Sequence, residues 1–308
     1  MLRMVRVGVV VLPQERWATQ RETWRRLEEQ GFDHAWTYDH LAWRSLADEP
    51  WFATVPLLAA AAAVTSRIGL GTFVASPNFR HPVPFAKDVM GLDDVSGGRF
   101  VLGVGAGGTG FDASVTGPAP TTAERTRRFT EFVELMDTLL RQPVTSHRGE
   151  FYEADEARMV PGTLARPRTP FVVAAAGPRA MALAARLGDG WVTYGPSFGP
   201  EDADAPDAQE RWWSGVAEQA ARMDDAERAA GRPGALRRYL SLDGAPRFSL
   251  GSLALALEGA ERAAGLGFHD VVVHQPRSAG VYAGDGAVLD ALAARLDEVH
   301  ALPVAARA

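Results

Sequence analysis

The stretch Ile68-Gly-Leu-Gly-Thr-Phe-Val-Ala-Ser-Pro-Asn-Phe-Arg-His-Pro82, together with Ser96-Gly-Gly-Arg-Phe-Val-Leu-Gly-Val-Gly-Ala-Gly107, decides the fold. It predicts a strand, an irregular turn, a helix, a second strand and a glycine-rich turn. Strands joined by a crossover helix lie parallel, so both carboxyl ends open on one face. An α/β protein binds its ligand on that face. The small residues there leave backbone amides accessible to a flat or anionic group.

The same alternation of strand and helix recurs along the chain. Near-continuous apolar strands are expected at residues 5–12, 32–38, 67–75, 99–105, 171–176, 190–194, 238–242 and 270–274. Helices are expected at 19–30, 56–65, 82–95, 122–141, 178–187, 207–230, 252–264 and 285–299. Such strands are buried on both faces. Eight repeats in this length predict one TIM-type (β/α)8 barrel domain over residues 1–308, with an open doubly wound sheet as the alternative.

Two connections are longer than the others and predict insertions after the fourth and sixth strands. The segment 142–168 contains Val144-Thr-Ser-His-Arg-Gly-Glu-Phe-Tyr152, which is typical of a small hairpin. Residues Gly195–Ala208 are rich in Pro, Gly and Asp and predict a loop over the mouth of the barrel.

Composition removes several classes of function. The formal charge of −6 argues against a nucleic-acid partner, because phosphate binding needs a basic face. The absence of cysteine excludes disulfides, thiolate catalysis and iron–sulfur clusters. Lys87 is the sole lysine, and its expected place on a helix does not suit Schiff-base chemistry. No run is long enough for a membrane span, and the start of the chain lacks a signal-peptide pattern, so we expect a cytoplasmic protein.

Asp39-His40, at the end of the second expected strand, is the best catalytic candidate. Histidine can hold or release a proton near neutral pH, which suits proton transfer during hydride or oxygen chemistry. The alternative interpretation is a strand-end pair that caps the next turn. The seven histidines form no His-x-His or His-Glu-x-x-His pattern, so we expect no metal site.

Two glycine turns are candidates for ligand binding. Ala175-Ala-Gly177-Pro-Arg179 leads from a strand into a helix, whose N-terminal amides favour an anion. Gly103-Val-Gly-Ala-Gly107 looks like a dinucleotide fingerprint but lacks its complete spacing. A Gly-x-Ser-x-Gly nucleophile elbow is absent.

Five motifs, in order, resemble the bacterial-luciferase-like family of flavin- and deazaflavin-dependent oxidoreductases. They are Phe32-Asp-His-Ala-Trp36 with Asp39-His40, Thr65-Ser-Arg-Ile-Gly-Leu-Gly-Thr72, Arg80-His-Pro82 with Ala86-Lys87, Leu92-Asp-Asp-Val-Ser-Gly-Gly-Arg99, and Gly177-Pro-Arg179 with Leu187-Gly-Asp-Gly-Trp191. Of these, Leu92–Arg99 is expected to be structural, a helix end and a turn into the next strand.

The resemblance implies an oxidoreductase that binds FMN or coenzyme F420 and acts on a small molecule. It implies that His40 transfers a proton and that Asp39 orients or contacts the ring system. Phe73, Val74, Ala75 and Ser76 would support the ring, with a cis peptide bond at Phe73–Val74. Gly105, Ala106 and Gly107, with Ala176, Gly177, Pro178 and Arg179, would hold the tail of the cofactor. Members of this family commonly form homodimers, and the apolar face at 56–64 would suit such an interface.

One departure bears on the substrate. Sugar-phosphate dehydrogenases of the deazaflavin branch carry a glutamate acid just after the glycines of the fourth strand, whereas this chain has Gly107-Gly108-Thr109, with Asp112 as the nearest carboxylate. Sugar-phosphate oxidation is therefore not expected, whereas another reductase or monooxygenase activity stays open. The alternatives from other classes are a non-catalytic flavin-binding barrel and a metal-free barrel lyase.

Overall fold

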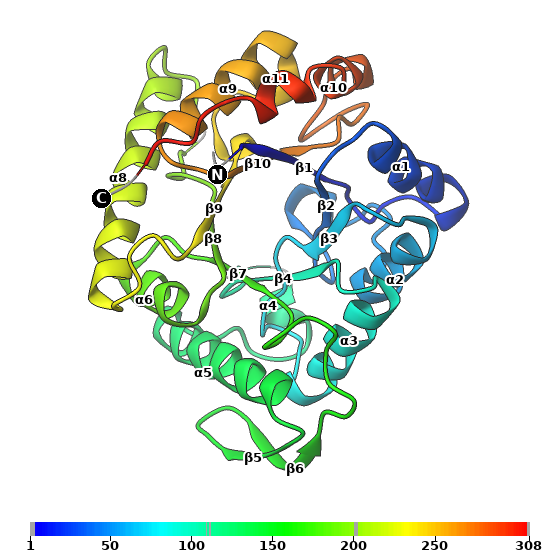
Figure 1. Ribbon diagram of the computed structural model, residues 1–308, viewed down its shortest axis with the longest axis vertical. Coiled ribbons are helices and arrows are strands. Elements are labelled where there is room, and N and C mark those ends of the chain that lie inside the picture. The colour runs from blue at the N-terminus through cyan, green and yellow to red at the C-terminus, as the bar shows by residue number, and fades with distance from the viewer. Residues whose placement is uncertain (1–3, 109, 111, 200–202, 307–308) are drawn as a thin grey trace. The chain divides into compact units, whose positions relative to one another are not determined.

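A computed structural model of the chain describes residues 4–108, 110, 112–199 and 203–306. Eight strands form a closed barrel in the order β1-β10-β9-β8-β7-β4-β3-β2, which confirms the predicted TIM-type fold (Figure 1). Their bounds are β1 Arg6–Val10, β2 His34–Thr37, β3 Gly69–Thr72, β4 Phe100–Val104, β7 Phe171–Ala174, β8 Gly190–Thr193, β9 Arg237–Ser241 and β10 Asp270–His274.

The helices follow the strands as expected. They are α1 Trp17–Glu29, α2 Thr54–Val64, α3 Pro82–Val95, α4 Asp112–Val115, α5 Thr122–Arg141, α6 Pro178–Leu187, α8 Ala208–Ala229, α9 Leu253–Gly265, α10 Gly286–Ala293 and α11 Leu296–His300. The single helix predicted at 285–299 is wrong, because Arg295 leaves helical geometry (φ −115°, ψ 11°) and separates α10 from α11. None of the described helices combines the length and the hydropathy that a membrane span requires.

The chain divides into two compact units. The first comprises residues 12–26 and 36–174. In it, β4 pairs in parallel with β3 and with β7. Helix α5 begins at Thr122 as predicted, and Thr121 forms a capping box with Glu124. One face of α5 is buried, and Phe132 packs against Phe85 of α3 with ring centroids 6.1 Å apart.

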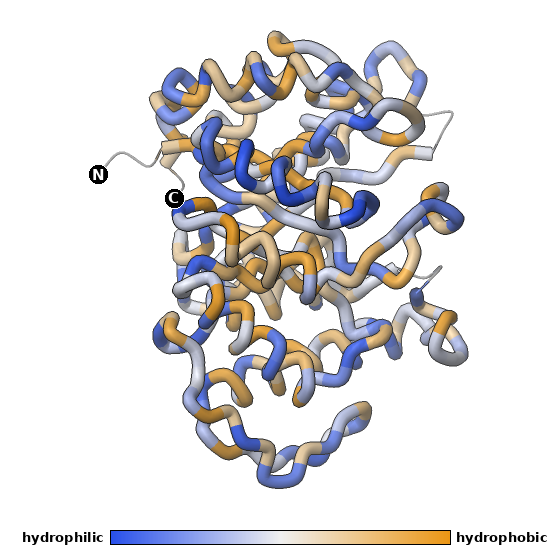
Figure 2. Tube along the Cα trace, turned by 90° about the vertical axis from the view of Figure 1, so that its right-hand side faces the viewer, coloured by the Kyte–Doolittle hydropathy of each residue, from blue (hydrophilic) through white to orange (hydrophobic). Residues whose placement is uncertain are grey.

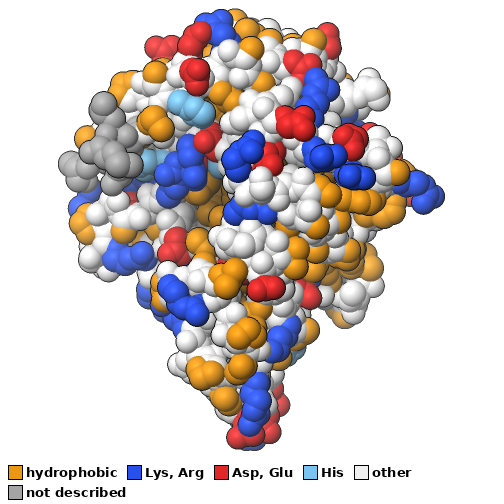
Figure 3. Space-filling model, turned by 45° about the vertical axis from the view of Figure 1, so that its right-hand side comes forward, with side chains coloured by type: hydrophobic (Ala, Val, Ile, Leu, Met, Phe, Trp, Pro, Cys, Tyr) orange, Lys and Arg blue, Asp and Glu red, His pale blue; other side chains and the backbone are white. Residues whose placement is uncertain are grey.

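The insertion before β7 is the expected hairpin, but it is longer than predicted. It consists of β5 Val144–Arg148 and β6 Glu153–Arg158, in antiparallel pairing beside α5 (Figure 1). Glu131 of α5 fixes its turn: the carboxylate accepts backbone N–H groups of Glu150, Phe151 and Tyr152, each at 3.0 Å. The strands are largely hydrophilic (Figure 2), and charges of both signs cover this end in the space-filling view (Figure 3). The carboxylate of Glu131 thus fixes the turn of the hairpin, and Tyr152, which packs against Phe132, buries its end.

Arg99 connects the start of β4 to the end of α2. Its guanidinium donates hydrogen bonds to the backbone carbonyls of Ala62, Thr65 and Ile68 at 2.8–3.1 Å, and to that of Ser96 at 2.7 Å. The carbonyls of Ala62, Thr65 and Ser96 lie at the ends of α2 and α3, where a helix leaves acceptors unpaired. The contacts confirm that the Leu92–Arg99 motif is structural.

The second unit comprises residues up to 11, 27–35 and 175 onward. Here β1 pairs in parallel with β10, β10 with β9, and β9 with β8. Fully buried aromatic side chains fill this unit, and Trp191 of β8 lies 5.7 Å from Phe268, measured between ring centroids.

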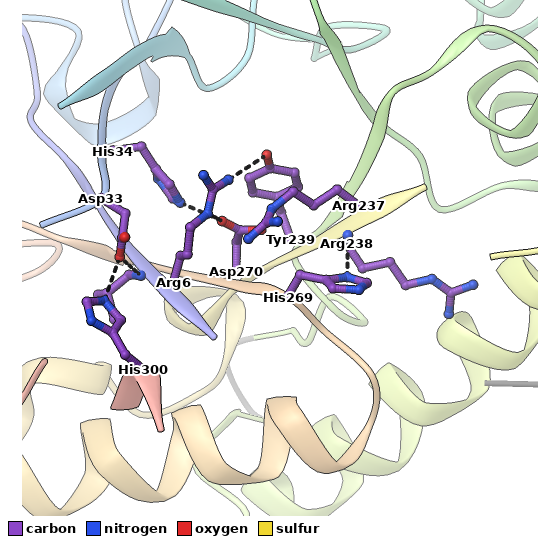
Figure 4. A network of polar contacts seen from close by, with 10 residues as sticks. Arg6, Asp33, His34, Arg237, Arg238, Tyr239, His269, Asp270 and His300 are labelled. Atoms are coloured by element: carbon purple, nitrogen blue, oxygen red, sulfur yellow. Dashed lines mark hydrogen bonds and ion pairs between the residues drawn. The ribbon is translucent and has the colours of Figure 1, made fainter. Parts of the chain in front are cut away.

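A buried ionic cluster joins the amino-terminal ends of four strands in this second unit (Figure 4). Asp270 opens β10 and is 0 % exposed. It accepts hydrogen bonds from Arg6 Nε at 2.8 Å, from His34 Nε2 at 2.9 Å, and from Arg237. Burial opposes the charged carboxylate, yet His34, Arg6 and Arg237 hold the pKa of Asp270 below its usual value. The cluster stabilises the fold only while every partner is present, because a buried charge without a partner is energetically costly.

Candidate active site

His40 lies just after β2, with its side chain 19 % exposed. Its Nδ1 is 2.8 Å from Oδ2 of Asp112, at the start of α4. Tyr38 and Trp51 flank the imidazole, with ring centroids 5.9 and 6.5 Å away, and Trp51 also donates from Nε1 to the His40 carbonyl oxygen. Within the described part of the chain, Nε2 of His40 has no hydrogen-bond partner. The histidine is thus anchored on one nitrogen and available on the other.

Asp39, the other predicted catalytic residue, is buried and paired with Arg80. The guanidinium donates to both carboxylate oxygens, at 2.5 and 2.7 Å. Arg80 also lies over the ring of Phe85, with 4.3 Å between Cζ and the centroid. This bidentate geometry is the strong form of an arginine–carboxylate pair. It gives Asp39 an internal partner, and its contact with a cofactor ring stays a prediction.

The segment Phe73–Ser76 follows β3 and runs parallel to the end of β4, with Ala75 bridged to Val104. The peptide bond Phe73–Val74 is cis, as the resemblance implied. The amide of Ala75 donates to the carbonyl of Gly103, and the amide of Gly105 to that of Ala75, both at 2.8 Å. Phe73, Ala75 and Ser76 are buried, whereas Val74 is half-buried.

Glycines on β4 and in the following turn allow this close approach. A Cβ built on Gly103 would lie 1.9 Å from the Thr72 carbonyl oxygen, and one on Gly105 would lie 2.7 Å from a methyl carbon of Val74. Gly107 has a positive φ of 77° and faces Asn78, 2.7 Å from its would-be Cβ. The glycines are therefore required by the backbone of the neighbouring segment.

Two arginines of α5 approach the same turn. Arg125 donates to the carbonyl oxygen of Gly107 at 3.1 Å, and Arg128 donates to Oδ1 of Asn78 at 3.0 Å. Both side chains are half-buried, and the Nε atom of each is buried without a hydrogen-bond partner. Neither forms a salt bridge with a described residue. Partly desolvated guanidinium groups that have neutral partners and an unpaired Nε favour an anion beside the turn.

The remaining predicted binding residues, Ala176–Arg179, belong to the second unit. They are exposed, with Gly177 as the N-cap and Pro178 as the first residue of α6. No side chain caps this helix start, so its backbone amides are accessible. Their role in holding a phosphate stays a prediction. Residues 200–202 of the expected lid loop, and Thr109, lie outside the described residues.

Sequence reasoning missed the partners in this site. Asp112 stood out only as the nearest carboxylate after the β4 glycines, and its contact with His40 spans 72 positions. His81 has a structural role that agrees with its position in a turn, since its ring accepts the Val83 amide at the start of α3. Arg125 and Arg128 gave no signal beyond their place in an amphipathic helix.

Comparisons with known proteins identify the family. The model of the luciferase-like monooxygenase family matches residues 2–239. The chain belongs to this family.

Several curated relatives are named for F420. The chain is 38 % identical over 169 residues to the F420-dependent glucose-6-phosphate dehydrogenase of Beutenbergia cavernae, covering 54 % of this chain and 49 % of that one. It is 33 % identical over 187 residues to the F420-dependent hydroxymycolic acid dehydrogenase of Mycobacterium tuberculosis, covering 59 % and 51 %. The matched region thus spans about half the length of these relatives.

Solved structures share the fold over nearly the whole chain. The coenzyme F420-dependent tetrahydromethanopterin reductase of Methanopyrus kandleri superposes with a TM-score of 0.76 at 16 % identity, covering 96 % of this chain and 99 % of that one. The monooxygenase RslO1 of Streptomyces bottropensis gives 0.73 at 22 % identity, covering 97 % and 99 %.

Proposed function

We propose that this protein is an F420-dependent oxidoreductase that exchanges hydride with a small organic molecule, with His40 as the proton carrier. The observation that carries the proposal is the state of His40, which is anchored through Nδ1 and open at Nε2. Membership of the luciferase-like family and the F420-dependent relatives support the cofactor class. FMN is the second candidate, since solved structures with this fold include proteins named for FMN.

The described residues fit an anionic flavin-type cofactor. Gly105 and Gly107 bring bare backbone to the end of β4. The unpartnered Nε atoms of Arg125 and Arg128 lie beside that turn and suit a phosphate or carboxylate. The accessible helix start at Ala176–Arg179 supports the predicted second anion contact.

When bound, the cofactor supplies the two-electron hydride chemistry. The chain itself carries the proton: Nε2 of His40 accepts it from the substrate during substrate oxidation and returns it during substrate reduction. Val74, which is half-buried beside the strand end, would support a flat ring, whereas Ala75 is fully buried and would act only by holding the backbone of this segment. The pairing of Asp39 with Arg80 fixes the strand end from which His40 projects.

The cofactor is tested by fluorescence titration of the purified protein with FMN and F420 in parallel. We expect micromolar or tighter binding of F420 and at least tenfold weaker binding of FMN. Arg128→Gln removes one of the two guanidinium groups beside the turn and should weaken F420 binding about tenfold or more. Arg148→Gln, at an exposed position of the hairpin, is the matched control. Binding of neither cofactor would overturn the oxidoreductase proposal.

The role of His40 is tested separately. His40→Ala should keep F420 binding within about threefold while abolishing cofactor reduction by an alcohol substrate found by screening. Glucose 6-phosphate belongs in that screen as the substrate named for a relative, and we expect no turnover with it. Tight F420 binding with no turnover under any reductant or substrate would instead favour the non-catalytic barrel.

Assembly and location remain proposals. We retain a homodimer and a cytoplasmic location as expected from the sequence. Part of the helix proposed for the interface is already covered inside the first unit, since Leu57, Leu58, Ala61 and Ala62 are buried there. Sedimentation of the purified protein tests the dimer.

A further inference from the structure

The neighbourhood of His40 contains a carboxylate that the proposed chemistry does not touch directly. Asp112 is 3 % exposed and opens the short helix α4. Its Oδ2 lies 2.8 Å from Nδ1 of His40 and on the opposite side of the ring from Nε2. A carboxylate is a hydrogen-bond acceptor, so this contact requires a proton on Nδ1.

We propose that Asp112 is the positioning residue of the site: it holds His40 in the Nδ1–H tautomer and thereby leaves Nε2 as a proton acceptor. The inference rests on the proposed role of His40. In this chain Asp112 would act through the histidine, in contrast to an acid that contacts the substrate. The orientation of an imidazole by a hydrogen bond to its other nitrogen is a general way of fixing the tautomer.

Asp39, the carboxylate next to His40 in the sequence, is engaged by another partner. Asp39 directs both oxygens at Arg80, and Asp88 also lies 3.9 Å from that guanidinium. Among the described residues, Asp112 is therefore the carboxylate that contacts the imidazole. Its burial strengthens the hydrogen bond, because little water competes for the carboxylate.

Aromatic neighbours restrict the imidazole further. Tyr38 meets it edge to face, and Trp51 flanks it while donating a hydrogen bond to the backbone of the same residue. A half-turn of the ring about the Cβ–Cγ bond would place Cδ2 where Nδ1 now lies and would therefore break the contact with Asp112. One orientation of the ring is thus favoured by packing and hydrogen bonding together.

The tautomer can be measured without cofactor or substrate. Protein labelled with ¹⁵N-histidine is examined by long-range ¹H–¹⁵N NMR at a pH where titration of the spectrum shows a neutral ring, and the His40 signals are assigned by their loss in His40→Gln. We expect a pyrrole-type Nδ1 and a pyridine-type Nε2 in the wild type. A protonated Nε2 with a bare Nδ1 would overturn the proposal, and this result needs no variant of Asp112.

Variants then show whether Asp112 is the cause. Asp112→Ala should lower the ratio of the Nδ1–H to the Nε2–H form about tenfold or more, and Asp112→Glu should restore part of it. Asp155→Asn, on the exposed face of the hairpin, should leave the ratio unchanged. An unchanged ratio in folded Asp112→Ala would refute the assignment.

Catalysis separates this inference from the proposed function. Once a substrate is found, Asp112→Ala should lower kcat about 100-fold or more, with the KM for F420 within threefold. If His40→Ala is fully active, the proposed function fails whatever the tautomer. If His40 is essential but Asp112→Ala keeps both kcat and the tautomer, only the positioning role fails.

Discussion

Replacement of Asp270 by asparagine should destabilise the fold without touching the candidate active site. The side chain is 0 % exposed and accepts hydrogen bonds from Arg6, His34 and Arg237. Asparagine has nearly the same shape, but its amide carries no charge and its NH2 group would face a donor. The substitution therefore leaves two guanidinium groups beside a neutral partner.

The magnitude follows from these contacts. A hydrogen bond to a charged group contributes about 1.5–3 kcal/mol, and removing one partner of a buried ion pair costs about 3–5 kcal/mol. The side chains of Arg6 and Arg237 are each 36 % exposed, so water can solvate these guanidinium groups and offset part of the ion-pair energy lost in the variant. We expect a loss of about 3 kcal/mol in the free energy of unfolding. With about 2 °C per kcal/mol for a chain of this size, the thermal midpoint should fall about 6 °C.

The measurement is thermal unfolding followed by circular dichroism, with Asp155→Asn as the exposed control. The control should melt within about 1 °C of the wild type. A midpoint for Asp270→Asn within 2 °C of the wild type would refute the reasoning, since it would mean that the cluster contributes no net stability.

The other predictions concern pH, a helix end and the hairpin. Burial lowers the pKa of His34 despite its hydrogen bond to Asp270, so the unfolded chain binds more protons than the folded protein near this pH. The free energy of unfolding should therefore fall as the pH drops below about 6.5. In thermal melts from pH 7.5 to 5, His34→Gln should make the thermal midpoint less dependent on pH. Arg99→Lys keeps the charge but loses the planar fork, and should cost about 2–3 kcal/mol in urea unfolding, whereas Arg148→Lys should cost nothing measurable. Glu131→Gln should make the hairpin more susceptible to limited proteolysis, while the thermal midpoint of the protein changes little. Equal rates of cleavage in the wild type and in Glu131→Gln would contradict this.

Elements with local signals were predicted well from the sequence. Proline at the first position of α3 and of α6, and a hydroxyl next to the first residue of α5, mark helix starts that the structure places at Pro82, Pro178 and Thr122. The periodicity of apolar residues does not reveal a single non-helical residue, so the single helix predicted at 285–299 missed the break at Arg295.

Contacts between distant residues account for what the sequence did not reveal about the site. Asp39 and His40 were recognised, whereas their partners Arg80 and Asp112 lie 41 and 72 positions away. Both partners become neighbours only because successive parallel strands end on one face. The sequence can therefore nominate the chemical groups of such a site, but their pairing is a property of the fold.

The glycines at the end of β4 have a consequence for protein engineering. Gly103 and Gly105 leave no room for a side chain because Thr72 and Val74 occupy that space, and those residues in turn follow a backbone path that only the glycines permit. Substitutions on one strand should thus be epistatic with those on the other. In a chimera of two luciferase-like proteins, β3 and β4 should be exchanged together as one segment. A crossover between them would combine the β3 backbone of one parent with the β4 glycine positions of the other, and the two would not pack together.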